Sequence, residues 1–269
     1  MKQVALGFLG AGNMAEAIAR GILKAGVLGP ARMLASDPDA ARRKVFADAL
    51  GIAAVEDNGE VVRRAATVLV AVKPQVFDKA LAPVSRAFGP KKLLVSISAG
   101  ISARHIEEVL AAGTRVVRAM PNTPMLVGRG IAAIAPGAAA TEADLKTAER
   151  LLGAAAEIVR VPEDLMDAVT AVSGSGPAYF FRLVELLAQA GTELGLPAEE
   201  ALRLARVTFE GAAKLLAESG ETPEALRRKV TSPGGTTEAA LRTFDALGLA
   251  KVVSQAVRAA HDRARELGR

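Results

Sequence analysis

The chain has 269 residues, of which 51% are hydrophobic and 23% charged, so intrinsic disorder is excluded and a sizeable buried core is expected. This length corresponds to nearly two domains of about 150 residues each. The 34 basic and 29 acidic residues give a net charge of +5 without a long basic run, and with eight Phe, one Tyr and no Trp there are few rings to stack on bases. The charge therefore favours an anionic small molecule over nucleic acid as a ligand.

The sequence contains few of the side chains that usually act as nucleophiles or bind transition metals. No cysteine is present, which excludes disulfides, thiolate nucleophiles and cysteine-ligated metals. The two histidines, His105 and His261, are too few for the usual histidine-rich metal site, and both fall in expected surface helices where we predict no functional role. No apolar run reaches the roughly 18 residues of a membrane span and no secretory signal is evident, so we expect a soluble, cytoplasmic protein.

The first half of the chain alternates short apolar runs with amphipathic segments. Strands separated by helices of this length form βαβ units, which predicts an α/β fold with a doubly wound parallel sheet. The runs TVLVAV and LLVSIS are continuous and rich in branched residues, as is typical of strands buried on both faces. The expected strands lie at residues 4–9, 32–36, 53–55, 67–72, 93–98, 115–119 and 131–135.

From residue 163 to the C-terminus the sequence shows helical periodicity and no convincing strand. We therefore expect a dinucleotide-binding domain at residues 1–162 and an all-helical domain at residues 163–269. Long apolar helices in a domain of about 105 residues usually need a second subunit to cover them, so at least a dimer is expected. Two apolar stripes carry this prediction: Leu183, Leu186, Leu187, Ala190 and Leu194, and Leu202, Ala205, Phe209, Ala212 and Leu216.

A glycine-rich turn follows the first expected strand. Gly10, Gly12 and Ala15 match the pattern G-x-G-x-x-G/A, directly after a strand and at the start of a helix. Gly10 permits the tight turn, Gly12 lets the backbone approach a pyrophosphate, and Ala15 is small enough for close packing of strand and helix. The helix N-terminus adds free N–H groups for the phosphates. Together with the βαβ pattern, this predicts a Rossmann-type domain that binds a nicotinamide dinucleotide.

Asp37 closes the second strand, 25 residues after Gly12. A carboxylate at this place accepts hydrogen bonds from the ribose hydroxyls of NAD and repels a 2′-phosphate. Arg42 and Arg43 on the following helix argue for the phosphorylated cofactor instead. Asp37 is equally suited to be the N-cap of that helix, because Asp-Pro is a good helix start.

Small and polar residues gather in further segments at strand or helix ends. Residues 72–74 and 98–100 follow two strong strands, and ligands of such sheets bind beyond the carboxyl ends of strands. The segment 118–124 carries two prolines and forms a stiff loop. In the helical half, residues 173–179 and 232–237 interrupt helices, and the second of these offers backbone N–H and hydroxyl donors that suit a carboxylate. The alternative is that these segments are helix-breaking connectors with capping hydroxyls.

Taken together, these segments resemble the pyrroline-5-carboxylate reductase family. The resemblance runs through the whole chain, and the two motifs of the helical half are its most specific part. It implies a Rossmann domain followed by a helical dimerisation domain, and reduction of the cyclic imine 1-pyrroline-5-carboxylate to L-proline by NADPH or NADH, the last step of proline biosynthesis. It also implies a homodimer or a larger oligomer of dimers, while composition and the lack of a long apolar run predict no nucleic acid and no membrane partner. The matching motifs are GFLGAGNMA (7–15), AVKP (71–74), RAMPNTP (118–124), AVSGSGPAY (171–179) and SPGGTT (232–237).

The resemblance, with the clusters at the strand ends, assigns the site residues and implies no metal. The backbone of residues 234–236 would hold the substrate carboxylate, and the Thr237 hydroxyl would lie near the ring nitrogen as the catalytic group. The substrate-binding residues are Glu163, Ser232, Gly234, Gly235, Thr236 and Thr237. The cofactor-binding residues are Leu9, Gly10, Ala11, Gly12, Asn13, Met14, Ser36, Asp37, Asn58, Ala71, Val72, Lys73, Pro74, Ser98, Ala99, Met120, Pro121 and Asn122.

Two positions depart from the family pattern. Asp37 stands where relatives that favour NADPH often carry Ser or Thr, which leaves the preference between NADH and NADPH open. Lys229 stands near a position where some relatives have an Asn at the cofactor, and we leave it outside the site. Tyr179, beside Phe180 and Phe181, is expected to be a core residue rather than a proton donor.

Two other functions fit parts of the sequence. A 3-hydroxyacid dehydrogenase shares the two-domain plan but depends on a lysine early in the second domain, and the segment SGSGPAYFFRLVELLAQ contains none. A non-catalytic dinucleotide sensor would use the helical half to bind a partner protein. Such a surface would not require the polar SPGGTT loop, so we favour the reductase.

Overall fold

The structure is a computed structural model that describes residues 4–267, so the first three and last two residues of the expected domains lie outside the described part. The described chain forms two compact units, residues 4–175 with 260–267, and residues 176–259. This division falls later than the boundary expected after residue 162. The reason is local packing, because Met166 is fully buried against Ala133 and Ala135 of the first unit.

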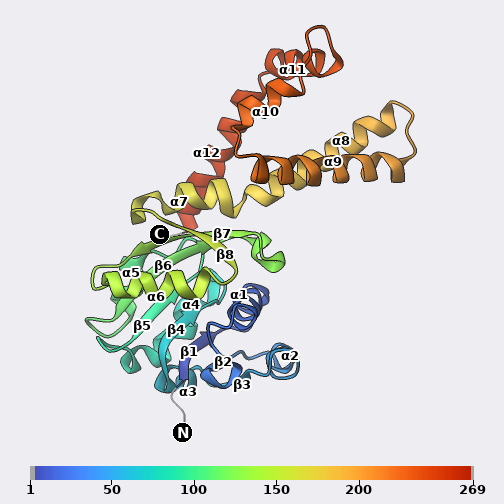
Figure 1. Cartoon of the computed structure of the whole chain (residues 1–269). Helices are drawn as coiled ribbons and strands as arrows, with labels where there is room; N and C mark the ends of the chain where they lie inside the picture. Colours follow the sequence, from blue (N-terminus) through green and yellow to red (C-terminus); the bar gives the residue numbers. More distant parts are fainter. Residues whose placement is uncertain (1–3, 268–269) are drawn as a thin grey trace. The chain divides into compact units, whose positions relative to one another are not determined.

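The first unit contains a sheet with the strand order β3-β2-β1-β4-β5-β6-β7-β8 (Figure 1). The strands from β3 to β6 are all parallel, which confirms the predicted doubly wound sheet. The strand order reverses between β1 and β4, and such a switch point is where ligands of open α/β sheets bind. The strands are β1 (Val4–Leu9), β2 (Met33–Ser36), β3 (Ala53–Val55), β4 (Ala65–Val70), β5 (Leu93–Ser96), β6 (Arg115–Pro121), β7 (Gly130–Pro136) and β8 (Ala156–Arg160).

The far edge of the sheet differs from the expectation. β7 runs antiparallel to β6, so the predicted continuation of the βαβ pattern is wrong there. The two strands are joined by a 3-10 turn, Thr123–Val127, and a connection without a helix is too short for a parallel crossover. β8 was not expected from the sequence and pairs parallel to β7. As a half-exposed edge strand, it lacks the apolar run that marks the buried strands.

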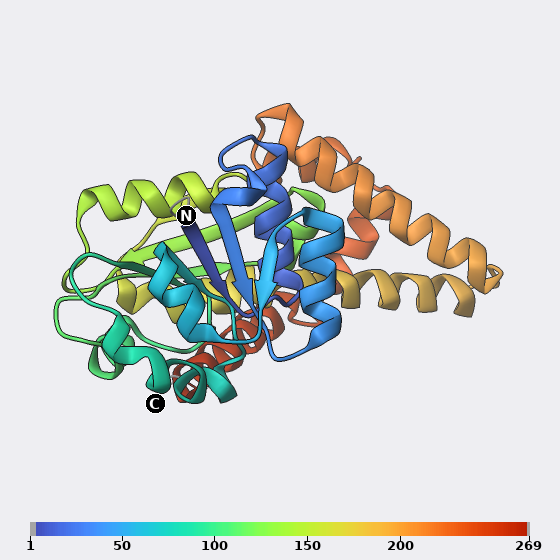
Figure 2. The ribbon, with the colours of Figure 1, turned by 90° about the horizontal axis from the view of Figure 1, so that it is seen from below.

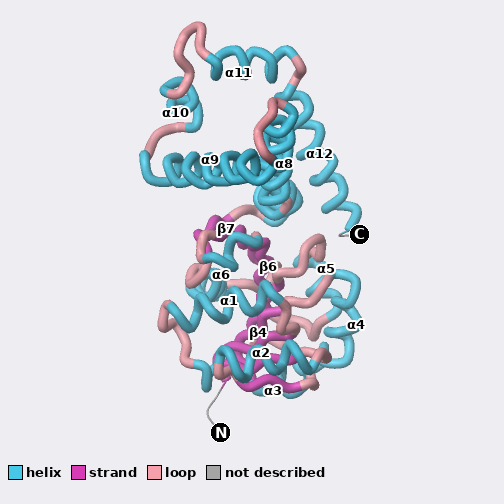
Figure 3. The backbone as a smooth tube through the Cα atoms, turned by 90° about the vertical axis from the view of Figure 1, so that its right-hand side faces the viewer, coloured by secondary structure: helices cyan, strands magenta, loops and turns pink. Residues whose placement is uncertain are grey.

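Helices cover both faces of the sheet (Figure 3). Apolar residues of α1, α2 and α6 form one core with one face, and those of α3, α4 and α5 form a second core with the other. In the first core Phe8 and Phe46 meet edge to face at 5.8 Å, worth about 0.5–1.5 kcal/mol beyond their burial. The helices are α1 (Asn13–Lys24), α2 (Ala40–Leu50), α3 (Asn58–Arg64), α4 (Phe77–Leu81), α5 (Ala103–Val109), α6 (Glu142–Leu152) and α7 (Met166–Val169), which a π-helical turn, Thr170–Gly174, follows.

The second unit is helical, as predicted. α8 and α9 form a hairpin in which Phe180 and Phe209 lie 5.6 Å apart (gold and orange in Figure 2). No helix within residues 4–267 is both long and apolar enough to span a membrane. The helices are α8 (Gly176–Glu193), α9 (Ala198–Ser219), α10 (Pro223–Lys229), α11 (Thr236–Ala246) and α12 (Leu249–Leu267), and α12 continues into the first unit.

The helical unit exposes much of its apolar surface. Tyr179 is 37% exposed beside the still more exposed Phe180 and Phe181, so a single chain does not provide the expected burial of this aromatic run. Apolar patches of this extent are typical of surfaces that another protein covers. The predicted stripes of α8 and α9 share this exposure, at Leu183, Leu186, Leu187, Leu194, Leu202 and Leu216.

Candidate active site

The glycine-rich turn between β1 and α1 has the conformation that a pyrophosphate site needs. Gly10 has a φ of 93°, and a Cβ there would lie 2.9 Å from the carbonyl oxygen of Ala71. Gly12 is the N-cap of α1, and no side chain caps this helix N-terminus. A Cβ on Gly12 would meet no heavy atom within 4 Å. The open space at Gly12 and the free helix N-terminus fit the approach of a dinucleotide.

The turn is fixed by backbone bonds to both neighbouring strands. The N–H of Gly10 donates to the carbonyl oxygen of Ser36 at 2.8 Å, and the N–H of Ala71 donates to that of Leu9 at 2.8 Å. The side chain of Leu9 is fully buried in the core, so only its backbone faces the turn. The predicted residues 9–12, 36 and 71 are therefore brought together at the switch point.

Asp37 binds the turn directly. Its Oδ2 accepts a hydrogen bond from the N–H of Ala11 at 2.7 Å, and its Oδ1 accepts one from the N–H of Asp39 at 2.9 Å. The N-cap of α2 is Asp39, whose side chain accepts from the N–H of Ala41 at 2.8 Å. The interpretation of Asp37 as a helix cap is therefore wrong. Its interpretation as a ribose acceptor stays a prediction.

The two arginines of α2 are bonded to the same region. The Nε of Arg42 donates to the carbonyl oxygen of Ala11 at 2.6 Å, and its Nη2 pairs with Glu16 at 2.7 Å. Glu16 is four-fifths buried; burial raises the pKa of its carboxyl, but hydrogen bonds from Arg42 and Arg20 outweigh burial and lower it. Arg43 donates to the carbonyl oxygens of Asp37 and Pro38. Both guanidinium groups are thus engaged with the protein.

Ser36 and Asn58 form a small network at the carboxyl end of β2. The Ser36 hydroxyl donates to Oδ1 of Asn58 at 2.7 Å, and Nδ2 of Asn58 donates to the carbonyl oxygen of Ala80 at 3.2 Å. Asn58 also lines a cavity of about 440 Å³ that includes Lys79 and Pro83. The structure therefore brings these two predicted cofactor residues together.

A cavity of about 320 Å³ lies at the ends of β4, β5 and β6, beside the first turn of α1. Ile97, Thr123 and Gly174 line it and were not predicted, although Thr123 and Gly174 fall within the quoted motifs. A Cβ on Gly174 would lie 2.5 Å from the Cε of Met120, so glycine there allows the close approach. The predicted residues that line this cavity are Met14, Ala71, Val72, Lys73, Pro74, Ser98, Ala99, Met120, Pro121 and Asn122.

Two polar side chains hold the wall of this cavity in place. The hydroxyl of Ser98 donates to the carbonyl oxygen of Val72 at 2.9 Å, which joins the ends of β5 and β4. Nδ2 of Asn122 donates to the carbonyl oxygen of Ser173 at 3.2 Å, and its Oδ1 accepts from the N–H of Ile131 at 3.0 Å. The side chain of Asn122 therefore joins the segment 118–124 to Ser173, the first residue of the segment 173–179.

Glu163, a predicted substrate residue, belongs to the first unit. Its Oε1 accepts from the N–H of Ala103 at 2.5 Å and lies 3.4 Å from Nη1 of Arg118, which is buried on β6. Asp167 lies 3.6 Å from the other terminal nitrogen of Arg118. The side chain of Glu163 keeps 30% of its surface exposed, so part of it is accessible.

The other predicted substrate residues belong to the second unit, in the loop before α11. Gly234 has a φ of 70°, and Gly235 is the N-cap of α11 without a side-chain cap. A Cβ on Gly235 would lie 2.5 Å from the hydroxyl oxygen of Ser232, which explains a glycine at this position. Lys229, which we left outside the site, pairs with Glu221 at 2.7 Å.

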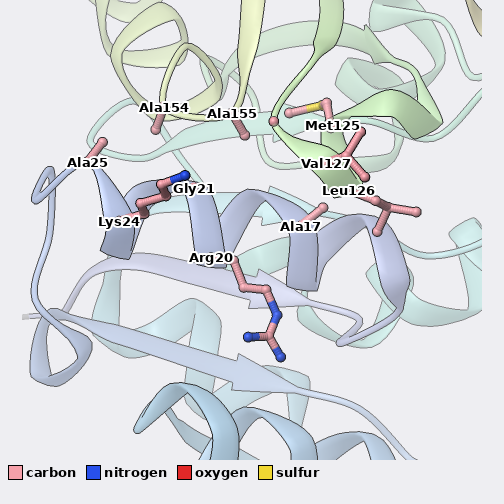
Figure 4. A pocket seen from close by; sticks show the side chains of 11 residues that line it. Ala17, Arg20, Gly21, Lys24, Ala25, Met125, Leu126, Val127, Ala154 and Ala155 are labelled. Atoms are coloured by element: carbon pink, nitrogen blue, oxygen red, sulfur yellow. The ribbon is translucent and has the colours of Figure 1, made fainter. Parts of the chain in front are cut away.

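A further cavity of about 550 Å³ lies between α1, the segment 125–128 and residues 154–155 (Figure 4). Gly21 and Ala155 are close here, since a Cβ on Gly21 would lie 2.5 Å from that of Ala155. None of the predicted site residues lines this cavity. Among residues 4–267, no cluster of three or more His, Asp or Glu side chains is arranged to hold a metal ion, and His105 pairs with Asp78.

Comparison with known proteins places the chain in a family. Residues 163–267 match the family model described as pyrroline-5-carboxylate reductase dimerisation, and residues 5–100 match the model described as NADP oxidoreductase coenzyme F420-dependent. Over 269 residues the chain is 40% identical to pyrroline-5-carboxylate reductase of Methanosarcina acetivorans, with 100% of both chains covered. The chain belongs to the pyrroline-5-carboxylate reductase family.

Solved structures agree with this membership. A pyrroline-5-carboxylate reductase from Coxiella burnetii is 32% identical with a TM-score of 0.92, and covers 100% of both chains. The pyrroline carboxylate reductase of Plasmodium falciparum, solved with NADP bound, is 29% identical with a TM-score of 0.86 over 100% of both chains. These matches confirm the predicted family, the nicotinamide dinucleotide cofactor and self-association through the helical half. The roles of individual site residues stay predictions.

Proposed function

We propose that the chain is a pyrroline-5-carboxylate reductase that converts the cyclic imine 1-pyrroline-5-carboxylate to L-proline with NADPH or NADH. The observation that carries this proposal is the match to the reductase of Methanosarcina acetivorans over the full length of the chain, which places a cavity of about 320 Å³ at the ends of β4, β5 and β6 in a member of this family. The site belongs to the family whose motifs the sequence carries, so substrate and reaction follow from membership rather than from the size of the cavity.

The first unit would hold the dinucleotide. The N–H groups at the start of α1 would face the pyrophosphate, and Ser36, Asp37 and Asn58 would lie on the side of the adenosine ribose. The reactive ring would occupy the cavity lined by Lys73, Ser98 and Met120, together with its other wall residues. When bound, the dinucleotide supplies the hydride.

The substrate would bind through its carboxylate and its ring nitrogen. We assign the carboxylate to the backbone of residues 234–236 and the ring nitrogen to the Thr237 hydroxyl, and we keep Glu163 as a proposed substrate-binding residue. A protonated imine is already electrophilic, so the protein needs to align and polarise it rather than supply a strong acid. The hydride adds to the imine carbon, and the electron pair of the C=N bond goes to the nitrogen. The proton on that nitrogen comes from the substrate itself or from solvent, which explains a site without histidine or cysteine.

The domain boundaries, the homodimer and the cytoplasmic location are also proposals. Residues 1–162 would act as the dinucleotide domain and residues 163–269 as the substrate and dimerisation domain, which the family match at residues 163–267 supports. We propose a homodimer as the smallest active form, because both hairpin helices expose apolar stripes. We place the enzyme in the cytoplasm, without nucleic acid or membrane partners, since it depends on a pool of reduced nicotinamide dinucleotide.

The decisive experiment measures initial rates with 1-pyrroline-5-carboxylate and with NADH and NADPH in parallel. Oxidation of either dinucleotide with formation of proline in equal amounts supports the proposal. Failure to turn over the imine with both would refute it. A preference for NADH would support Asp37 as the ribose acceptor, whereas a preference for NADPH would assign the 2′-phosphate to basic or backbone groups of the same region.

A further inference from the structure

Two side chains of β6 face the later segment 163–174. Arg118 and Met120 are two residues apart in the strand, so their side chains lie on the same side of the sheet. Arg118 pairs with two carboxylates at the beginning of the segment. Met120 meets its end, since a Cβ on Gly174 would lie 2.5 Å from the Cε of Met120. One strand therefore supports both ends of the segment.

The part of the segment between these contacts is a continuous helical stretch. α7 runs directly into the π-helical turn, in which the N–H of Ser175 donates to the carbonyl oxygen of Thr170 at 2.8 Å. The hydroxyls of Thr170 and Ser173 each donate to the carbonyl oxygen four residues earlier, at 2.9 and 3.0 Å. Because a rigid helical element carries a displacement along its length, a shift at the start of α7 reaches Gly174, which lines the cavity of about 320 Å³.

The guanidinium of Arg118 is held between two carboxylates. Its Nη1 lies 3.4 Å from Oε1 of Glu163 and its Nη2 lies 3.6 Å from Oδ1 of Asp167, while the Arg118 side chain is 6% exposed. Oε1 of Glu163 also accepts from the N–H of Ala103, at the start of α5. The planar guanidinium directs one terminal nitrogen to each carboxylate. Without its charge, the repulsion between two partly buried carboxylates would not be compensated, and the segment would lose its attachment to β6.

We infer that Arg118 is a positioning residue of the active site. Its two ion pairs hold the segment 163–174 on β6, and this sets the space between Met120 and Gly174 in the cavity assigned to the reactive ring of the dinucleotide. This inference rests on the proposed function and deepens it. Arg118 does not line the cavity and acts through the segment, without contact with the reacting atoms.

The inferred effect is confined to the ring end of the cofactor. The residues proposed for the adenosine ribose are held by other groups, because Ser36 donates to Asn58 and Asp37 accepts from two backbone N–H groups. None of these bonds involves the segment 163–174. Loss of the Arg118 charge should therefore weaken the hold on the nicotinamide ring and leave the ADP-ribose part of the cofactor bound as before.

The test uses the full-length enzyme and two ligands that differ by the nicotinamide ring. Isothermal titration calorimetry measures the Kd of NADH and of ADP-ribose, or of NADPH and 2′-phospho-ADP-ribose if the enzyme prefers NADPH. We expect Arg118→Met to raise the Kd of the dinucleotide about fivefold and that of the ring-free ligand by less than about twofold. The kcat for the imine should fall about tenfold or more, since a misplacement of about 1 Å can cost on the order of 100-fold.

Two further variants separate the charge of Arg118 from its packing. Arg118→Lys keeps a positive charge between the carboxylates and should lower kcat by no more than about threefold. Asp167→Asn removes one ion pair without altering Glu163, which is itself a proposed substrate-binding residue. We expect its kcat to fall about threefold with KM for the imine unchanged, and the Kd of the dinucleotide to rise while that of the ring-free ligand does not. Because the two residues act as a pair, Asp167→Asn should add nothing to the loss in Arg118→Met.

Arg115 offers a matched control on the same strand. Its Nη1 lies 2.6 Å from Oδ1 of Asp144, whose side chain is 4% exposed, but this pair joins β6 to α6 and neither residue lines the cavity. Arg115→Met should lower the free energy of unfolding, because it leaves a buried carboxylate unpaired. It should leave kcat and the ratio of the two Kd values unchanged.

The outcomes separate the inference from the proposed function. Equal weakening of both ligands by Arg118→Met, the same loss of kcat in Arg115→Met, or no gain of Arg118→Lys over Arg118→Met would overturn the positioning role. If Arg118→Met does not fold, Asp167→Asn decides, because it should weaken the dinucleotide and not the ring-free ligand. A wild-type enzyme that does not reduce the imine contradicts the proposed function instead. The two Kd values still test the inference in that case, since calorimetry does not use the imine.

Discussion

The Nε of Arg42 donates a hydrogen bond to the carbonyl oxygen of Ala11 at 2.6 Å, while the N–H of Ala11 donates to Asp37. Both polar groups of this residue in the middle of the glycine-rich turn are thus held by side chains from beyond β2. The turn that we predict to face the pyrophosphate is therefore shaped by the segment that we predict to face the adenosine ribose. A change in that segment should alter the binding of any dinucleotide, with or without a 2′-phosphate.

Arg42→Met tests whether Arg42 orders the turn or recognises a 2′-phosphate. Because its Nε and Nη2 are bonded to Ala11 and Glu16, we expect KM for NADH and NADPH to rise alike, by about tenfold, for the loss of one or two charge-assisted bonds. Arg64→Met, which removes a surface pair with Glu60, should change neither. A rise confined to NADPH would show that Arg42 instead binds the phosphate.

Asp37→Asn tests the ribose prediction without removing the acceptor for Ala11. The amide oxygen can still accept from that N–H, but the negative charge that repels a 2′-phosphate is lost. We expect the ratio of kcat/KM for NADPH to that for NADH to increase about tenfold, a typical gain for one removed charge repulsion. An unchanged ratio would assign Asp37 to the turn alone.

Gly12→Val separates binding of the cofactor from folding. A Cβ on Gly12 meets nothing within 4 Å and its φ is −70°, so we expect the variant to fold and self-associate while losing NADPH binding. Gly7→Val is the contrasting variant, because its Cβ would lie 2.5 Å from Cγ1 of Val61. It should lower the free energy of unfolding by about 1–3 kcal/mol or more by overpacking. Unchanged NADPH affinity of folded Gly12→Val, measured by titration, would contradict the predicted approach path.

Thr237→Ala examines the assigned catalytic hydroxyl. We expect kcat/KM for the imine to fall about 10- to 100-fold, as for loss of one hydrogen bond that orients the reacting group, with NADPH affinity unchanged. Thr237→Ser should keep most of the activity, because it retains the hydroxyl. Equal weakening of NADPH binding by Thr237→Ala would show that this loop does not serve the substrate.

Glu16→Gln examines the pH dependence of stability. The arginines lower the pKa of folded Glu16, so the charged form stabilises the fold above the unfolded pKa of about 4.3, and this contribution disappears as the pH falls through the lower folded pKa. At pH 7 the variant should be less stable by about 1 kcal/mol, and the difference should shrink in acid below about pH 4. Urea unfolding at several pH values measures this, and a difference that grows in acid would contradict it.

The sequence predicted the parts of the fold that local patterns determine. The turn at Gly10 and Gly12 was predicted because only a few residue types satisfy a tight turn after a buried strand. β4 and β5 were expected from their branched apolar runs, but each ends before the predicted limit, at Val70 and Ser96, and the residues beyond are the cavity wall. Ala71, Val72 and Ile97 keep the apolar composition of a strand although they lie beyond the strand ends and line the cavity.

The rest depended on contacts between distant residues. β8 was missed because Glu157 and Arg160 break its apolar pattern at the edge of the sheet. The bonds from Arg42 to Ala11 and from Asn122 to Ser173 join residues 31 and 51 positions apart, and no spacing rule indicates which donors will meet. Spacing also did not indicate that Asp39, and not Asp37, would be the N-cap of α2. Asp37 instead accepts the hydrogen bonds from the N–H groups of Ala11 and Asp39.

The apolar surface of α8 and α9 has a consequence for how the protein behaves in dilute solution. If covering that surface is part of the free energy that keeps the helical unit folded, then unfolding and dissociation are one linked equilibrium. The melting temperature would then rise with the concentration of the chain itself. Dilution alone would increase the fraction of unfolded chains. The amount of enzyme a cell makes would help to determine what fraction of it is folded.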